Sequence, residues 1–168
     1  MRILKNILAI LSVVAAFSFA ASAQTTLTSL NGANVDVQGQ KGKVVILAFS
    51  ASWLPLSGRQ SEYTNFLAQK YAGRKVVVYF VATDSTASKS KNFATNENIQ
   101  KFGTVNKITV PILRDSDGIL TLKKFNIDQL PSFVILDKDG NQYGDAFGGI
   151  SPKYDITVPI SKAVDKLL

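Results

Sequence analysis

Hydrophobic residues in this chain gather into four short runs that do not alternate with polar residues. The runs are 44–49, 76–81, 109–113 and 133–136. They are rich in β-branched and aromatic residues, and unbroken apolar runs of this length indicate strands buried on both faces of a sheet. A fifth strand is predicted at 142–147, because the tight turn at 137–141 would join it to the fourth run as a hairpin.

Between these runs the hydrophobic period becomes that of a helix. One face of the segment 55–72 carries apolar residues at helical spacing: Tyr63, Phe66, Leu67 and Tyr71. Three further helices are predicted, at 91–102, 117–125 and 151–168. Because strands that alternate with helices require crossover connections, we expect an α/β fold. Its central sheet would be mixed and mostly parallel, with helices on both faces and a C-terminal hairpin plus helix.

The first 23 residues have the three parts of a secretory signal peptide. Arg2 and Lys5 form a positive start, the apolar stretch 7–21 follows, and 21–23 is a small-x-small cleavage pattern. The apolar stretch is short for a membrane span of about 20 residues, which disfavours an uncleaved anchor. We predict cleavage near Ala23 and an exported protein, periplasmic or secreted. The chain would meet the membrane only through this segment, before cleavage.

The remainder is predicted to fold as one domain. Residues 24–42, with turns rich in Asn, Gln and Gly, are interpreted as an N-terminal extension with an edge strand or hairpin, and 43–168 as the α/β domain. Of the 168 residues, 46% are hydrophobic and 18% are charged, a composition that supports a buried core and excludes a disordered chain.

Two residue types are missing, and this excludes several classes of function. The sequence has no Cys and no His. Disulfides, thiol catalysis, Cys/His zinc sites and nucleophile–His relays are therefore excluded. The acidic clusters at 115–118 and 137–141 fit a helix cap and a tight turn better than calcium loops. We predict neither a metal site nor a cofactor.

The charge of the chain is basic but dispersed. Lys and Arg number 19 against 12 Asp and Glu, a formal net charge of +7. The cations occur singly or in pairs, and no basic stripe is interleaved with aromatic residues. This pattern disfavours nucleic acid as a partner.

Three separated segments have a common resemblance. Phe-Ser-Ala-Ser-Trp-Leu-Pro-Leu-Ser, at 49–57, follows a buried strand and opens a helix. The other two are 110–115 (Val-Pro-Ile-Leu-Arg-Asp) and 128–140, which contains Leu-Pro-Ser-Phe-Val-Ile-Leu-Asp-Lys-Asp-Gly. In order and spacing they resemble motifs of thioredoxins, especially the secreted disulfide reductases of the TlpA and redoxin group. The resemblance implies a thioredoxin-like fold over about 25–168, with Pro131 in the place of a cis-proline.

This sequence differs from that group at the two positions where the group has its reactive cysteines. The resemblance places the two active-site cysteines of the group at Leu54 and Ser57. Leu54 has no ionisable atom, and a serine needs a neighbouring base that no His supplies. No Lys lies in the helix opening, and Arg59 stays protonated. We therefore predict no catalytic residue, and we exclude thiol–disulfide exchange or peroxidase activity by the chain alone.

The resemblance leaves a binding groove in place of the dithiol. In thioredoxin-like proteins the equivalent surface is an apolar groove that holds an extended polypeptide. The positions that correspond to it here are Trp53, Leu54, Pro55, Leu56, Leu130 and Pro131. Because an apolar patch of this kind often marks a protein contact, we predict binding of a partner protein or extended peptide. Structural roles compete with this interpretation: Trp53 would cap the core beside the end of the strand, and Pro55 suits a first helical turn.

Two other functions stay open from the sequence. The protein could be an oxidoreductase-family member that acts with thiols supplied by a partner or through another site. It could also be a structural, self-assembling envelope protein. Neither the partner nor the oligomeric state is predicted.

Overall fold

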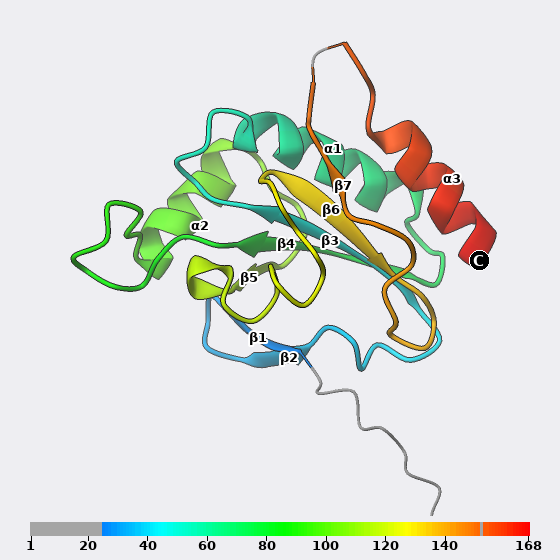
Figure 1. The fold of residues 1–168 in the computed structure, drawn as a ribbon, viewed down its shortest axis with the longest axis horizontal. Helices are drawn as coiled ribbons and strands as arrows, with labels where there is room; N and C mark the ends of the chain where they lie inside the picture. Colours follow the sequence, from blue (N-terminus) through cyan, green and yellow to red (C-terminus); the bar gives the residue numbers. More distant parts are fainter. Residues whose placement is uncertain (1–24, 152) are drawn as a thin grey trace, which may run out of the picture.

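A computed structural model describes residues 25–151 and 153–168, so the predicted signal segment lies outside the described residues. A single seven-stranded sheet forms the centre, and three α-helices pack on it (Figure 1). In chain order the elements are β1 (Thr26–Ser29), β2 (Asn34–Asp36), β3 (Val44–Ser50), α1 (Ser57–Lys70), β4 (Val76–Ala82), α2 (Asn96–Val105), β5 (Ile112–Arg114), the 3-10 helix η1 (Ser116–Gly118), β6 (Ser132–Leu136), β7 (Phe147–Gly148) and α3 (Thr157–Leu167). Within these described residues, no helix combines the length and apolar character needed to cross a membrane.

The sheet is mixed, as predicted, with the strand order β2-β1-β5-β4-β3-β6-β7. The expectation that the sheet is mostly parallel is wrong: among the described strands only β3–β4 and β4–β5 pair in parallel, and the other neighbours are antiparallel. β6 runs against β3 because the segment 115–131 stays at the carboxyl end of the parallel strands instead of crossing the sheet. The first residue of β6, Ser132, therefore pairs with Phe49 near the end of β3. This reversal brings the start of β6 to the carboxyl end of β3, the end of the sheet where α1 begins.

The four apolar runs are buried strands, although the third is shorter than predicted. Every residue of β3 and of β6 is buried. In the third run the regular strand starts only at Ile112. The strand expected at 142–147 is reduced to an isolated bridge at Gln142 and to β7. The turn at 137–141 is confirmed, with Gly140 at a φ of 85°.

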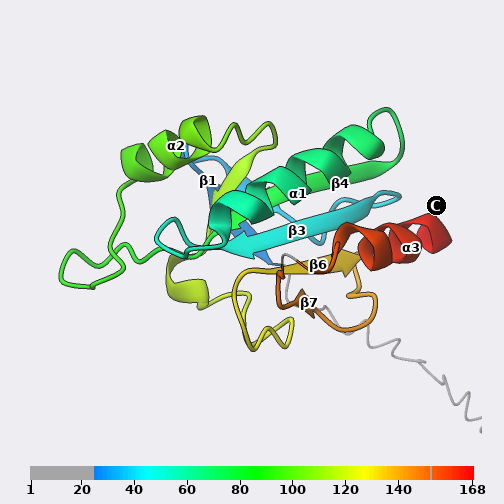
Figure 2. The same ribbon diagram turned by 90° about the horizontal axis from the view of Figure 1, so that it is seen from above.

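The three α-helices contribute to a core on one face of the sheet. Leu67 of α1, Ile99 of α2 and Ile160 of α3 are fully buried in it. Seen from above, α1 lies over β3 and β4, and α3 lies over β6 (Figure 2). α1 and α3 confirm the helices predicted at 55–72 and 151–168, with shorter bounds. α2 begins at Asn96 instead of 91, because Thr95 forms a capping box with Asn98.

The opposite face, where a helix was also expected, is covered by no α-helix among the described residues. Its core contains Leu27 of β1, Val37 after β2, and Phe125 from the turns that follow η1. The helix predicted at 117–125 is wrong in extent, because only η1 is helical there. Asp117 and Asn126 have positive φ values of 57° and 49°, a left-handed conformation that a right-handed helix cannot continue through.

Candidate functional site

The loop 51–56 joins β3 to α1 and holds four of the six residues predicted to bind. Two backbone turns shape it: the N–H of Leu54 donates to the carbonyl of Ala51 (3.1 Å), and the N–H of Ser57 donates to the carbonyl of Leu54 (3.2 Å). Trp53 is 54% exposed and Leu56 is 39% exposed. Pro55 is also exposed, whereas Leu54 is half-buried. The loop thus presents apolar side chains to solvent at the start of a helix.

Ser57, the second former cysteine position, points inward. Its side chain is fully buried. Its hydroxyl lies 2.6 Å from that of Ser50 and donates to the carbonyl of Ala51, also at 2.6 Å. The oxygen is therefore occupied by hydroxyl and carbonyl partners, neither of which acts as a base. The prediction that Ser57 is not a nucleophile agrees with this geometry.

Leu130 and Pro131 complete the set of predicted binding residues. The peptide bond between them is cis, which confirms the expectation from the resemblance. Pro131 is buried and Leu130 is half-buried. Because Ser132 pairs with Phe49, both residues lie at the end of the sheet that carries the loop 51–56. The structure therefore brings the two predicted segments to one end of the molecule, with exposure concentrated in the loop.

A buried polar row lies beneath the beginning of α1, and the sequence analysis missed it. The side-chain amide of Gln60 donates to the carbonyl of Ser132 (2.7 Å), and Ser61 and Thr64 donate to carbonyls one turn back in α1. All three side chains are fully buried, while Phe66, which was predicted to face the core, is 49% exposed. The polar residues at 57, 60, 61 and 64 share one helix face, and such a pattern predicts a solvent-exposed face, so the sequence contained no signal for this burial.

Asp84 fixes the loop 51–56 in place. This residue follows β4 and is fully buried. Its carboxylate accepts the backbone N–H of Ser52 at 3.0 and 3.1 Å and also the Ser52 hydroxyl. The sequence analysis did not select Asp84, because one acidic residue after an apolar run has no distinctive spacing.

A buried arginine lies behind Asp84. The Arg114 guanidinium donates to the carbonyls of Ala94 and Asp84 and to the side chain of Asn96, each at 3.0 Å. Burial lowers the pKa of Arg114, and the nearby negative charge of Asp84 opposes that shift. Through these hydrogen bonds, the Arg114 guanidinium connects the loop after β4 with the end of β5. In the described part of the chain, no three His, Cys, Asp or Glu side chains are close enough together to hold a metal ion.

Residues 18–141 match the model of the AhpC/TSA family. The chain belongs to the AhpC/TSA family. Its sequence is 29% identical over 114 residues to "Thiol-disulfide oxidoreductase ResA" of Bacillus thuringiensis, covering 68% of this chain and 60% of that protein. It is 30% identical over 115 residues to "Thioredoxin-like protein YneN" of Bacillus subtilis, covering 68% and 62%. The match thus spans about three fifths of the length of these relatives.

Solved structures of low sequence identity confirm the thioredoxin-like fold. A secreted Mycobacterium tuberculosis disulfide oxidoreductase homologous to DsbE superimposes with a TM-score of 0.65 at 23% identity, over 86% of this chain and 96% of that chain. A putative protein disulfide isomerase from Bacteroides thetaiotaomicron gives 0.68 at 17% identity, over 86% of each chain. A third neighbour is an exposed lipoprotein thioredoxin of Streptococcus pneumoniae, with 0.65 at 23% identity, over 85% of this chain and 99% of that chain.

Proposed function

We propose that this protein is a non-catalytic member of the AhpC/TSA family that binds an extended segment of a partner polypeptide. The binding surface is the former active-site face, defined as Trp53, Leu54, Pro55, Leu56, Leu130 and Pro131. One observation carries the proposal: the two cysteine positions hold a leucine and a fully buried, hydrogen-bonded serine. The scaffold around them keeps its arrangement.

The chemistry of the site supports a loss of redox activity. The relatives are named thiol-disulfide oxidoreductases, and thiol–disulfide exchange requires a thiolate. This chain has no cysteine. Its remaining hydroxyl at these positions, on Ser57, bonds to Ser50 and Ala51 and has no base beside it.

The exposure of the loop supports binding. Trp53 and Leu56 present large apolar surfaces, and tryptophan is enriched among residues that dominate binding energy. Asp84 holds the backbone of Ser52 from below. A surface already held in one conformation loses little entropy on binding.

The place of action is part of the same proposal. The signal-like segment before residue 24 indicates export. Two structural neighbours are described as secreted and as an exposed lipoprotein. Both observations support a partner outside the cytoplasm, in the periplasm or the secreted fraction.

The test is affinity capture by the processed chain from its native envelope fraction, followed by binding measurements on the purified pair. Trp53→Asp should weaken binding about tenfold or more, because it places a charge at the centre of an apolar contact. Val158→Asp is the matched control, since Val158 is 64% exposed on α3. Equal binding by the two variants would contradict the proposed face. Insulin or peroxide reduction by the purified chain would contradict the non-catalytic role.

A further inference from the structure

A pocket of about 500 Å³ lies at the carboxyl end of β5, on the side of the sheet that carries α2. Thr28 of β1 pairs directly with Arg114, and residues paired in this way have their side chains on one face of the sheet. The Arg114 guanidinium bonds to Ala94 and Asn96, at the beginning of α2, which identifies that face. The volume is within the range of ligand sites, roughly 300–1,000 Å³.

The lining of this pocket combines hydroxyl groups with one apolar part. Ile119 and Leu120, which follow η1, are 75% and 53% exposed and form the apolar part. The charged residues in the lining are Arg114 and Asp115, and both are buried. The hydroxyl groups come from β1, from the loop after β4 and from η1: Thr26, Thr28, Ser29, Thr86 and Ser116.

Arg114 brings a buried donor without an acceptor to this pocket. The residue is 7% exposed, and neither ion pair found among the described residues includes it. Its two terminal nitrogens donate to Ala94, Asn96 and Asp84, but its Nε–H has no hydrogen-bond partner in the part of the chain that the structure describes. Because a buried donor without an acceptor is unfavourable, this group calls for an acceptor atom of a ligand.

The charges near Arg114 favour an uncharged acceptor over an anion. Asp84 already provides a negative charge, which raises the pKa of Arg114 against the lowering effect of burial. Asp115 adds a second negative charge, and its carboxylate is held in place by the backbone N–H groups of Leu120 and Thr121. A ligand carboxylate would bring a third negative charge close to these two and would be repelled by them.

The apolar part of the lining restricts the ligand further. Burial of aliphatic surface is favourable, so a ligand that covers Ile119 and Leu120 carries an aliphatic group. A carbonyl oxygen would accept from the Nε–H of Arg114. An amide N–H beside that carbonyl would donate to a hydroxyl of the lining, because Ser and Thr hydroxyls accept as well as donate. An aliphatic amide therefore matches all three parts of the lining.

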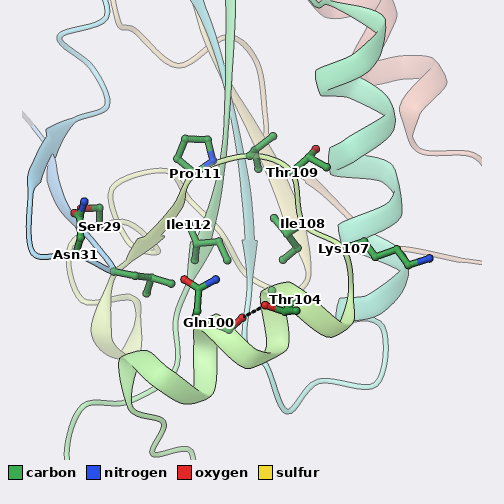
Figure 3. A pocket seen from close by; sticks show the side chains of 12 residues that line it. Ser29, Asn31, Gln100, Thr104, Lys107, Ile108, Thr109, Pro111 and Ile112 are labelled. Carbon is green, nitrogen blue, oxygen red and sulfur yellow. Dashed lines mark hydrogen bonds between the residues drawn. The ribbon is translucent and has the colours of Figure 1, made fainter.

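The neighbouring hollow between α2 and β5 lacks such a buried group. Figure 3 shows Gln100 and Thr104 of α2 on one side of it, Ile112 in its centre and Lys107 at one end. It measures about 550 Å³. Each polar side chain of its lining is exposed or half-buried and can bond to water, so this hollow does not call for a ligand.

We propose that the pocket at the carboxyl end of β5 binds a small uncharged amide with a branched aliphatic side chain, either free or as one residue of a peptide. The ligand carbonyl accepts from the Nε–H of Arg114, and its aliphatic group covers Ile119 and Leu120. The pocket shares no residue with the former active-site face, so this inference does not rest on the proposed function.

The probe is N-acetyl-L-leucinamide, titrated into the isotope-labelled processed chain and followed by NMR. Binding should shift the side-chain Nε–H signal of Arg114, slow its exchange with water, and shift the backbone amides of Thr28 and Leu120. N-acetyl-L-leucine, with a carboxylate in place of the amide, should bind at least about fivefold more weakly at neutral pH. A capped Ala-Leu-Ala peptide distinguishes the two sources of the amide: tighter binding than the probe indicates a peptide residue, and equal or weaker binding indicates a free amide.

Substitutions at exposed positions complete the test. Leu120→Asn should weaken binding of the probe about fivefold, because it removes an aliphatic contact. Thr28→Val should weaken it about threefold through loss of a hydroxyl. Val158→Asn, at an exposed position on α3, is the matched control and should leave binding unchanged. The proposal is overturned by an absence of binding at millimolar probe, by equal or tighter binding of N-acetyl-L-leucine, by an unmoved Arg114 signal, or by shifts confined to 51–56 and 130–131.

Discussion

At the scale of single residues, Ser57 shows how a buried hydroxyl at the start of α1 serves the structure of the loop before it. Ser57 contributes two contacts inside the protein, to the Ser50 hydroxyl and the Ala51 carbonyl. A buried hydroxyl with satisfied partners holds its neighbours in place, and its removal leaves those partners without hydrogen bonds. We therefore expect Ser57 to contribute to the free energy of unfolding and not to a reaction.

Ser57→Ala should lower the free energy of unfolding by about 1–3 kcal/mol, because the Ser50 hydroxyl loses its partner in the interior. Binding through the former active-site face should stay within about twofold of the unmodified protein. Urea unfolding measures the first quantity. Ser88→Ala, at an exposed loop position, is the control and should change the free energy of unfolding by less than about 0.5 kcal/mol.

Two buried tyrosines make stability depend on alkaline pH. Burial is the main cause that raises the pKa of Tyr71 above its ordinary value, and burial also raises the pKa of Tyr79. A raised pKa in the folded state means that the unfolded chain loses its proton first. The stabilisation is thus fully present below about pH 10 and is lost as the pH rises through the folded-state values. Tyr71→Phe and Tyr79→Phe should each flatten this decline in urea unfolding between neutral pH and pH values above about 10. A decline of unchanged steepness in both variants would contradict the assignment.

At the scale of elements, the start of α2 is set by a side-chain cap more than by hydrophobic period. α2 starts at Asn96 because Thr95 accepts from the N–H of Asn98 (3.2 Å) and the Asn98 side chain accepts from the N–H of Thr95 (3.0 Å). Apolar residues before this point suggested an earlier start, but the loop after β4 is held by its own bonds. The N–H of Ser85, for instance, donates to the carbonyl of Asn92 (2.9 Å).

Thr95→Ala should destabilise the protein by about 1 kcal/mol, since it removes one half of the capping box. Thr104→Ala makes the same chemical change inside the same helix, where the hydroxyl bonds only to the Gln100 carbonyl (3.0 Å). Its effect should be smaller than about 0.5 kcal/mol. Thermal unfolding of the two variants side by side checks the prediction, and equal losses would show that Thr95 does not act as a cap.

At the scale of the whole molecule, the sheet reversal is what assembles the former active-site face. Because β6 starts at the carboxyl end of β3, Pro131 comes to the edge where α1 begins. The fold therefore keeps the framework of a dithiol site without the thiols. Placing cysteines at positions 54 and 57 tests whether this backbone arrangement still supports thiol chemistry.

The double substitution Leu54→Cys and Ser57→Cys should produce insulin-reducing activity, with the pKa of the thiol at position 54 below the ordinary value of about 8.5. The amides of the first turn of α1 would stabilise the thiolate. A control with the same spacing in another helix, Glu97→Cys with Gln100→Cys in α2, should stay inactive. Equal turnover by the two variants would show that the framework at α1 is no longer competent.

The sequence alone determined the four buried strands, the fold class and the absence of thiols. Buried strands such as 44–49 can be recognised from the sequence alone, because an apolar run without alternation has no polar face to direct toward solvent. The match of three ordered motifs with a thioredoxin-like pattern predicted the cis bond at Pro131, and the absence of cysteine follows from counting residues.

Tertiary structure alone decided which side of α1 is buried and where the 117–125 segment leaves helical geometry. The side-chain amide of Gln60 donates to the carbonyl of Ser132, a partner 72 residues away that only the folded chain supplies, whereas Thr64 bonds to the Gln60 carbonyl one turn back in α1. Local patterns describe what a segment can bury, whereas long-range contacts decide what it does bury.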